Sequence, residues 1–472
     1  MSVTLPFCDF GSDTNCDHSG EHTKRTLSMS ATAQIASGHD RTSALLNAGG
    51  LDPGMTDTLR LATRGSDLAL RQAGTVRDAL SSRRRDVELR RVETRGDQIP
   101  DELIHRLGRT GAFVRALDEE VLDGDADLAV HSLKDVPTEG MGDMVVAGVP
   151  ERAPSGDVLV HPDGLGIEDL PSGSVVGTGS LRRTAQIKAA RPDLTVEPLR
   201  GNVDTRIEKL LAPRLQAEHE RRLIASGEAR AATAEEGGES GEEGDGETDA
   251  DEPNWDALGD DEGGDGGEGD SEGDDVDEEF DQTVEEWFDS LSDLERAAME
   301  RKVETEYDAI VLAEAGLRRS ELFYEVETTR LPREEFVPAA GQGAIAVTAT
   351  DPDVIEDVRS AVDHPRTRVA VTVERTILGE LNGGCVAPIG VSALVQGEHV
   401  HTRVRVLSTD GTEEVADTRD LPIRSHAKAA EEFAADLADR GAADLIAAAR
   451  EETEGGADEG TRVGTEEEAA DE

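Results

Sequence analysis

Short apolar runs alternate with amphipathic stretches over most of the chain. The apolar runs predict buried strands, and apolar residues that recur every three to four positions predict helices. The predicted strands are 59–63, 87–92, 128–131, 158–160, 175–177 and 309–312, with two more around Val391 and Val404. The predicted helices are 68–80, 113–124, 181–190, 204–211, a helical run that begins at Asp289, 369–378 and 425–449. This alternation favours an α/β fold with largely parallel sheets.

The pattern is missing at the start of the chain and again in the middle. Residues 1–57 lack periodicity and Met55 stands just before the first strand, so we expect a disordered or untranslated extension there. The second gap is an insert at about 212–306, whose core, 234–286, holds 26 acidic residues and no Lys or Arg. Such a composition cannot bury enough apolar surface to offset its ordering entropy, so we expect the core to be disordered and solvated.

Both tryptophans, Trp255 and Trp287, lie in or beside the core of the insert. We therefore expect both indole rings to be in a mobile, wet environment. Residues 451–472 are a second acidic stretch and are expected to form a tail.

The charge of the chain restricts the partners that it can have. With 103 Asp and Glu against 48 Lys and Arg, the formal net charge is −55, which excludes a nucleic-acid binder held by a basic surface. No apolar run is long enough to span a membrane, and the N-terminus lacks the apolar core of a secretory signal, so we expect a cytoplasmic protein. Cys8, Cys16 and Cys385 are too few for a disulfide framework and complete no zinc site.

The six lysines beside 42 arginines, in so acidic a chain, favour a host with a very salty cytoplasm. At about 1 M salt the Debye length falls to about 3 Å, which screens the self-repulsion of such a surface. An ordinary acidic protein with disordered tails is the other interpretation.

Polar and basic residues gather at the ends of the predicted strands and the starts of the helices that follow. They are Arg64, Ser66, Lys134, Asp135, Thr178, Ser180, Arg182, Arg183, Arg200 and Arg206. Ligands of open α/β sheets bind at the carboxyl ends of the strands, and arginine binds planar oxyanions with two parallel hydrogen bonds. If these ends converge, they form a positive cleft for a small molecule with several carboxylates or phosphates.

Cys385 follows two glycines and precedes Pro388. A lone buried cysteine is usually an inert small hydrophobe, whereas this setting favours an exposed loop in which a thiol could react. The residues alone leave both interpretations open.

Seven motifs, in one order, resemble those of a known family. They are Thr94-Arg95-Gly96-Asp97, His131-Ser132-Leu133-Lys134-Asp135-Val136-Pro137, Gly177-Thr178-Gly179-Ser180-Leu181-Arg182-Arg183, Leu199-Arg200-Gly201-Asn202-Val203, Ala315-Gly316-Leu317, Gly341-Gln342-Gly343 and Gly383-Gly384-Cys385. From about Leu59 to Ala449, without the insert, the chain resembles the porphobilinogen deaminase (hydroxymethylbilane synthase) family, in an acidic, halophile-like variant.

The resemblance implies an α/β fold with two doubly wound domains, similar to type II periplasmic binding proteins, and a smaller α/β C-terminal domain that carries the cofactor cysteine. The implied domains are 58–152 with 343–362, then 153–342 interrupted by the insert, then 363–450. It also favours a monomer.

The activity that the resemblance implies is that of a transferase in tetrapyrrole biosynthesis. The family joins four porphobilinogen molecules head to tail, releases ammonia, and frees hydroxymethylbilane by hydrolysis. Its primer is a dipyrromethane cofactor, held by a thioether to a cysteine that matches Cys385. A thiolate is a soft nucleophile suited to the electrophilic methylene that remains when ammonia leaves.

The catalytic aspartate of the family matches Asp135, whose carboxylate would stabilise the cationic pyrrole nitrogen and assist proton transfer. The resemblance implies that the cofactor is bound by Lys134, Thr178, Ser180, Arg182, Arg183, Arg200 and Arg206. Substrate would be bound by Arg64, Ser66, Arg319, Gln342 in the hinge segment, and Arg106 in the mobile loop. No metal site is implied.

The chain departs from the family at three places. Gly179 stands where many members have a serine of the anion-binding loop. Arg106 and Thr110 stand at the positions of two mobile-loop lysines. The insert replaces what is normally a tight connection.

Two other functions compete with this one. A non-enzymatic two-lobed anion-binding or sensing protein would give Cys385 no role and would usually carry a secretory signal or a DNA-binding helical domain, which the sequence does not show. An acidic interaction protein built around the insert does not account for the seven motifs.

Overall fold

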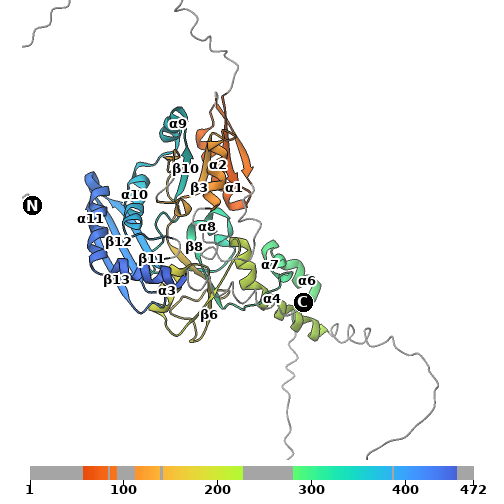
Figure 1. Ribbon diagram of the computed structural model, residues 1–472. Coiled ribbons are helices and arrows are strands. Elements are labelled where there is room, and N and C mark those ends of the chain that lie inside the picture. The colour runs from red at the N-terminus through yellow and green to blue at the C-terminus, as the bar shows by residue number, and fades with distance from the viewer. Residues whose placement is uncertain are drawn as a thin grey trace, which may run out of the picture. The chain divides into compact units, whose positions relative to one another are not determined.

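Within the part of the chain that the structure describes, the strands form three sheets, two of five strands and one of three. The structure is a computed structural model that describes residues 57–82, 85–92, 112–138, 142–226, 280–384 and 387–453. Figure 1 shows helices beside each sheet. The two larger sheets are mixed and mainly follow the strand–helix alternation, which confirms the predicted α/β class.

The first sheet combines strands from residues 57–148 with one strand from 345–349. Its strands, in hydrogen-bonded order, are β2 (Arg85–Val92), β1 (Asp57–Arg64), β3 (Leu128–Ser132), β10 (Ile345–Ala349) and β4 (Val145–Gly148). β1, β2 and β3 are parallel, whereas β10 runs antiparallel between β3 and β4. Its helices are α1 (Asp67–Leu80), α2 (Ala112–Leu122) and α9 (Pro352–Val362). In Figure 1, β10 lies beside β3 although Ser132 and Ile345 are far apart in the sequence.

The second sheet has the order β7 (Thr195–Pro198), β6 (Val175–Thr178), β8 (Ala309–Ala313), β5 (Asp157–Val160) and β9 (Thr328–Arg330). β6, β7 and β8 are parallel to one another, and β5 is antiparallel to β8 and to β9. α3 (Leu181–Ala190), α4 (Val203–Ser226) and α8 (Glu314–Arg319) each follow a parallel strand, and the short η3 (Leu322–Tyr324) follows α8. Apolar residues of β5 and β8 are buried on both faces, as continuous apolar runs predict.

The third unit has an antiparallel sheet of β11 (Ile389–Gln396), β12 (His399–Leu407) and β13 (Glu414–Pro422). Its helices are α10 (Pro365–Glu380), the short η4 (Ile423–Ser425) and α11 (His426–Asp439), followed by a helical stretch at 442–453. The prediction of a single helix over 425–449 is therefore wrong, because two helical stretches occupy this range. Gly441 has a φ of +100°, which ends α11 because an α-helix requires negative φ.

The three-helix cluster, formed by α4 and by α6 (Val284–Ser290) and α7 (Asp293–Met299), joins the two sides of the acidic segment. α4 continues past its predicted end at Leu211. α6 and α7 both start with a capping box, in which a hydroxyl and a glutamate satisfy backbone N–H groups reciprocally. Structure therefore extends further into the expected insert than composition indicated.

Trp287 is not in the wet environment that we expected for it. Its side chain is buried, and its ring stacks on His219 with centroids 5.9 Å apart. Arg222 lies over the same ring at 5.2 Å and over Phe280 at 4.3 Å. The expectation is wrong for Trp287 because α6 packs its apolar face on α4, and Trp255 lies outside the described residues.

Candidate active site

Asp135 lies at the carboxyl edge of the first sheet. β3 ends at Ser132 and continues into η2 (Leu133–Asp135), where Lys134 and Asp135 are both exposed. Arg64 ends the parallel neighbour β1, so it belongs to the same edge. Ser66 caps α1, because its hydroxyl accepts a hydrogen bond from Ala69 N at 3.4 Å. These four predicted site residues therefore share one edge of one sheet.

The other predicted site residues lie at the carboxyl edge of the second sheet. Parallel strands end on the same side of a sheet, and β6, β7 and β8 are followed directly by the segments concerned. These segments carry Thr178, Ser180, Arg182, Arg183, Arg200, Arg206 and Arg319. The expected gathering of basic residues at strand ends is thus present in the second sheet.

Gly179 has a packing reason to be glycine. A Cβ at this position would lie 2.8 Å from Leu199 O, which is closer than real Cβ atoms approach a backbone atom. Leu199 N also donates to Thr178 O at 3.2 Å, so the loops after β6 and β7 lie side by side. Glycine at this position therefore allows the loops after β6 and β7 to come together.

Arg206 and Arg319 carry positive charges that no described carboxylate balances. Arg206 donates to Gly201 O at 2.8 Å, and Arg319 donates to Gly343 O at 2.7 Å. Desolvation lowers the pKa of both to about 10, and for Arg206 the charges of Arg183 and Arg200 add to this effect. Guanidinium groups held in this way favour an anionic ligand.

Arg182 and Arg183 are buried and face inward to Asp157, a residue that the sequence analysis missed. Asp157 accepts hydrogen bonds from Arg182 Nη2 at 2.8 Å and from Arg183 Nη2 at 2.7 Å. Arg182 Nε is buried with no hydrogen-bond partner among the described residues. A buried N–H without an acceptor is rare, so it indicates that a ligand or water supplies one.

The crossover segment, residues 341–343, connects the two edges. Gly341 has a φ of +73°, and a Cβ there would lie 3.2 Å from Lys134 N, so the segment presses on η2. Gln342 Oε1 accepts from Arg182 Nη2 at 3.4 Å on the side of the second sheet. Gly343 has a φ of +81°, and a Cβ there would meet Ala153 O at 2.7 Å. The close approaches and the left-handed backbone explain why the residues on either side of Gln342 are glycines.

Two charged residues of α10, Glu374 and Arg375, also hold this region and were not predicted. Glu374 is fully buried, and its carboxylate accepts from Gly341 N at 2.7 Å and from Arg152 Nη1 at 2.7 Å. Arg375 donates to Val136 O at 2.7 Å, just after Asp135. Adjacent charges on a helix usually indicate a solvent-exposed surface, so sequence reasoning passed over both residues.

Cys385 and Arg106 lie outside the described residues, as does the motif at 94–97. The described residues nevertheless fit a dipyrromethane with acetate and propionate side chains. The buried, unpartnered Arg182 Nε and the unbalanced charges of Arg206 and Arg319 offer donors to carboxylates. The hydroxyls of Thr178 and Ser180 lie beside them in the sequence and at the same sheet edge.

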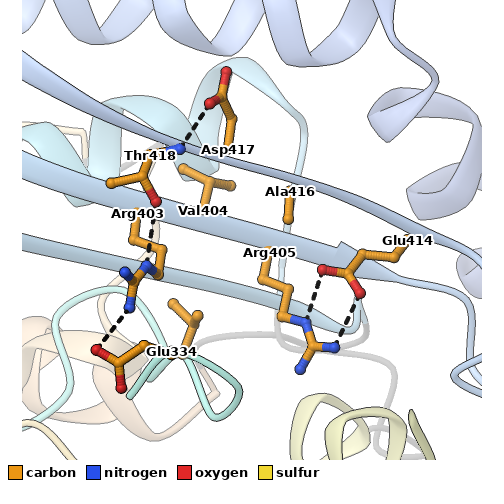
Figure 2. Close-up of a pocket in the computed structure, with 9 residues that line it drawn as sticks. Glu334, Arg403, Val404, Arg405, Glu414, Ala416, Asp417 and Thr418 are labelled. Carbon is orange, nitrogen blue, oxygen red and sulfur yellow. Dashed lines mark hydrogen bonds and ion pairs between the residues drawn. The ribbon is translucent and has the colours of Figure 1, made fainter.

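A pocket of about 300 Å³ lies elsewhere, between β12, β13 and the segment around Glu334 (Figure 2). Its charges are all in ion pairs: Arg405 with Glu414 at 3.0 Å, Arg403 with Glu334 at 3.4 Å, and Asp417 with Arg440 at 2.9 Å. It therefore offers no unbalanced charge to a ligand. Over the ranges that the structure describes, no group of three His, Cys, Asp or Glu side chains could hold a metal ion, and no helix could cross a membrane.

Comparisons with known proteins show which family the chain belongs to. The family profile "Porphobilinogen deaminase, dipyromethane cofactor binding domain" matches residues 59–220 and 296–356, and "Porphobilinogen deaminase, C-terminal domain" matches 369–440. A probable porphobilinogen deaminase of Halobacterium salinarum is 56% identical over 395 residues, which cover 84% of this chain and 98% of that protein. That source fits the acidic, halophile-like composition.

More distant relatives carry the same name. A probable porphobilinogen deaminase of Methanococcoides burtonii is 31% identical over 82% of this chain and 95% of its own length. A porphobilinogen deaminase of Campylobacter hominis is 29% identical over 83% of this chain and 98% of its own length. With two family profiles matched and relatives covered almost completely, this chain belongs to the porphobilinogen deaminase family.

Proposed function

We propose that this chain is a porphobilinogen deaminase, a transferase that condenses four porphobilinogen molecules head to tail, releases ammonia and yields hydroxymethylbilane. The observation that carries the proposal is the set of guanidinium groups at the edge of the second sheet, where Arg206 and Arg319 have no carboxylate partner among the described residues. In a chain with a net charge of −55, such a local positive site selects a ligand with several carboxylates.

We propose Asp135 as the catalytic residue. Its carboxylate is exposed at the end of β3, on a turn held by Arg375 and by the crossover segment. A fixed negative charge there stabilises a pyrrole nitrogen that becomes cationic as the amine leaves, and the same oxygen can accept or return a proton. The packing behind the turn supports this role because a charge that is held in place needs little reorganisation during the reaction.

The basic and hydroxyl residues are proposed to bind carboxylates. We assign cofactor binding to Lys134, Thr178, Ser180, Arg182, Arg183, Arg200 and Arg206, and substrate binding to Arg64, Ser66, Arg319, Gln342 and Arg106. Fork-shaped donors fix a carboxylate in direction as well as in position, which orients the reacting rings. Gln342 is buried, and it also joins the crossover segment to Arg182.

We propose Cys385 as the attachment site of the dipyrromethane cofactor. When bound, this cofactor supplies the terminal pyrrole to which substrate units are added. We also propose that the protein is a cytoplasmic monomer without nucleic-acid or membrane partners. A non-enzymatic anion-binding protein is not favoured, because it would need neither Asp135 nor Cys385.

The mass of the purified protein tests this function. The expected result is a mass above that of the polypeptide by one dipyrromethane, and a turnover of porphobilinogen with release of ammonia. Digestion should place the added mass on the peptide that contains Cys385. A protein of unmodified mass that does not consume porphobilinogen would contradict the proposal.

We propose that the acidic insert is not required for the chemistry. Replacing residues 234–279 with a short Gly/Ser linker should leave turnover nearly intact, because loop length contributes only about 0.6 kcal/mol per doubling. The replacement keeps α6, whose Trp287 packs on α4. The measurement is the turnover rate together with the thermal midpoint.

A second replacement, of residues 234–290, is the matched control. It also removes α6 and the ring stack between His219 and Trp287, so we expect a lower thermal midpoint. A tenfold loss of turnover in the shorter replacement would contradict a passive insert.

A further inference from the structure

Asp157 is a fully buried carboxylate at the edge of the candidate site. It is the first residue of β5, and its side chain has no exposed surface. Oδ2 accepts from Arg182 Nη2 at 2.8 Å. Oδ1 accepts from Arg183 Nη2 at 2.7 Å and Nε at 3.1 Å, and from Gln342 Nε2 at 2.9 Å. One carboxylate thus joins two site arginines and the crossover segment.

Asp157 stays ionised despite its burial. Desolvation alone would raise the pKa of this carboxyl group, but the charges and hydrogen bonds of Arg182 and Arg183 outweigh it and hold the pKa at about 2. At neutral pH the group is therefore one negative charge between two positive ones. The net positive charge that remains is available to an external anion.

The hydrogen bonds of the two arginines show what this arrangement fixes. Arg183 donates from Nε and Nη2 to Asp157, and from Nη1 to Val311 O at 3.0 Å. Arg182 donates from Nη1 to Val337 O at 2.8 Å and from Nη2 to Asp157. Each guanidinium plane is therefore held by two different elements. The second N–H groups of Arg183 and the unpartnered Nε of Arg182 are left in fixed directions.

Gln342 extends the same network to the crossover. Its Nε2 also donates to Ser155 O at 2.6 Å, and its main-chain oxygen accepts from Arg152 Nε at 2.7 Å. The two stretches of chain that pass between the sheets, at 152–157 and 341–343, are thus tied together at Asp157.

We infer that Asp157 is the positioning residue of the candidate site, which fixes the direction of Arg182 and Arg183 toward the carboxylates of the ligand and ties that direction to the crossover segment. This inference rests on the proposed function. Asp157 touches no ligand, because its oxygens are occupied by the protein itself.

A merely structural ion pair would behave differently, and Glu314 provides the comparison. Glu314 is also buried between two arginines, at 2.7 Å from Arg318 Nε and 2.7 Å from Arg330 Nη2. Neither of these arginines belongs to the candidate site. Glu314→Gln therefore removes a buried charge of the same kind without reorienting Arg182 or Arg183.

The test compares Asp157→Asn with Glu314→Gln in the full-length protein, by substrate KM and kcat, the cofactor-loaded fraction from intact mass, and the thermal midpoint. We expect Asp157→Asn to raise KM by roughly 10–100-fold, by analogy with the loss seen when the partner that orients a metal ligand is removed, and to lower the loaded fraction. We expect Glu314→Gln to lower the thermal midpoint while KM and loading stay within about twofold, since only the structural ion pair is lost.

Asp157→Glu covers the case in which Asp157→Asn does not fold. It keeps the charge but displaces it by one methylene, so KM should still rise and loading should still fall. Wild-type KM and loading in either folded Asp157 variant would overturn the inference. A wild-type protein without the cofactor mass would instead overturn the proposed function, so the two failures are distinguishable.

Discussion

Asp135→Asn is expected to lower the turnover of porphobilinogen by roughly 10²–10³-fold, the loss seen when one preorganised electrostatic group is removed. Asparagine keeps the size and much of the hydrogen bonding of aspartate, but it removes the negative charge opposite the cationic pyrrole nitrogen. The turn that carries the residue is held by Arg375 at Val136 O and Pro137 O, so the variant should fold. The adduct mass should therefore persist, at least in part.

The measurement is the rate of hydroxymethylbilane formation together with the intact mass. Asp143→Asn is the matched control. Asp143 is an exposed aspartate on the turn before β4, so this substitution removes the same charge outside the candidate site. A fully active Asp135→Asn would show that the charge at this strand end is not catalytic, and the arginines of the second sheet would become the next candidates.

Cys385→Ser is expected to abolish stable cofactor attachment and, with it, primed turnover. Serine preserves the shape of the side chain but replaces a soft thiolate with a hydroxyl whose pKa is much higher, so it is a poor nucleophile for an electrophilic methylene. Intact mass should show no stable adduct. Cys8→Ser and Cys16→Ser are the matched controls, and both should keep the adduct and the rate.

The two variants separate attachment from catalysis, because they should differ in mass as well as in rate. Cys385→Ser should give no adduct, and Asp135→Asn should give an adduct with little turnover. Tetrapyrrole formation at the wild-type rate in Cys385→Ser would rule out the primer mechanism.

Local patterns predicted the elements around the site well. The helix expected at 181–190 is α3 as observed, because Ser180 precedes an amphipathic run that ends before Pro192. The strand expected at 309–312 is β8, one residue longer. Both depend on short-range periodicity, which the sequence displays directly.

The residues that hold the site could not be found in this way. Asp157 is one acidic residue at the start of a short strand, and only the sheet order brings it beside α3. Glu374 is an ordinary helical glutamate until the crossover segment is packed against it. Contacts between segments distant in sequence decide the roles of both, and no local pattern encodes those contacts.

Two further misses have local causes. β13 was not predicted because its apolar residues hardly alternate and most of its side chains are partly exposed at the sheet edge. α6 was overlooked because the acidic composition around it concealed a readable signal, the capping box of Thr283 and Glu286.

The position of the acidic segment between α4 and α6 makes the two halves of the chain interdependent. β8, from the second half, is a central strand between β6 and β5 of the first half, and β10, also from the second half, lies between β3 and β4. A polypeptide that stopped within the acidic segment would therefore leave both larger sheets without an inner strand. The enzyme could be divided there into two separately made chains, but neither chain could complete either of the two larger sheets alone.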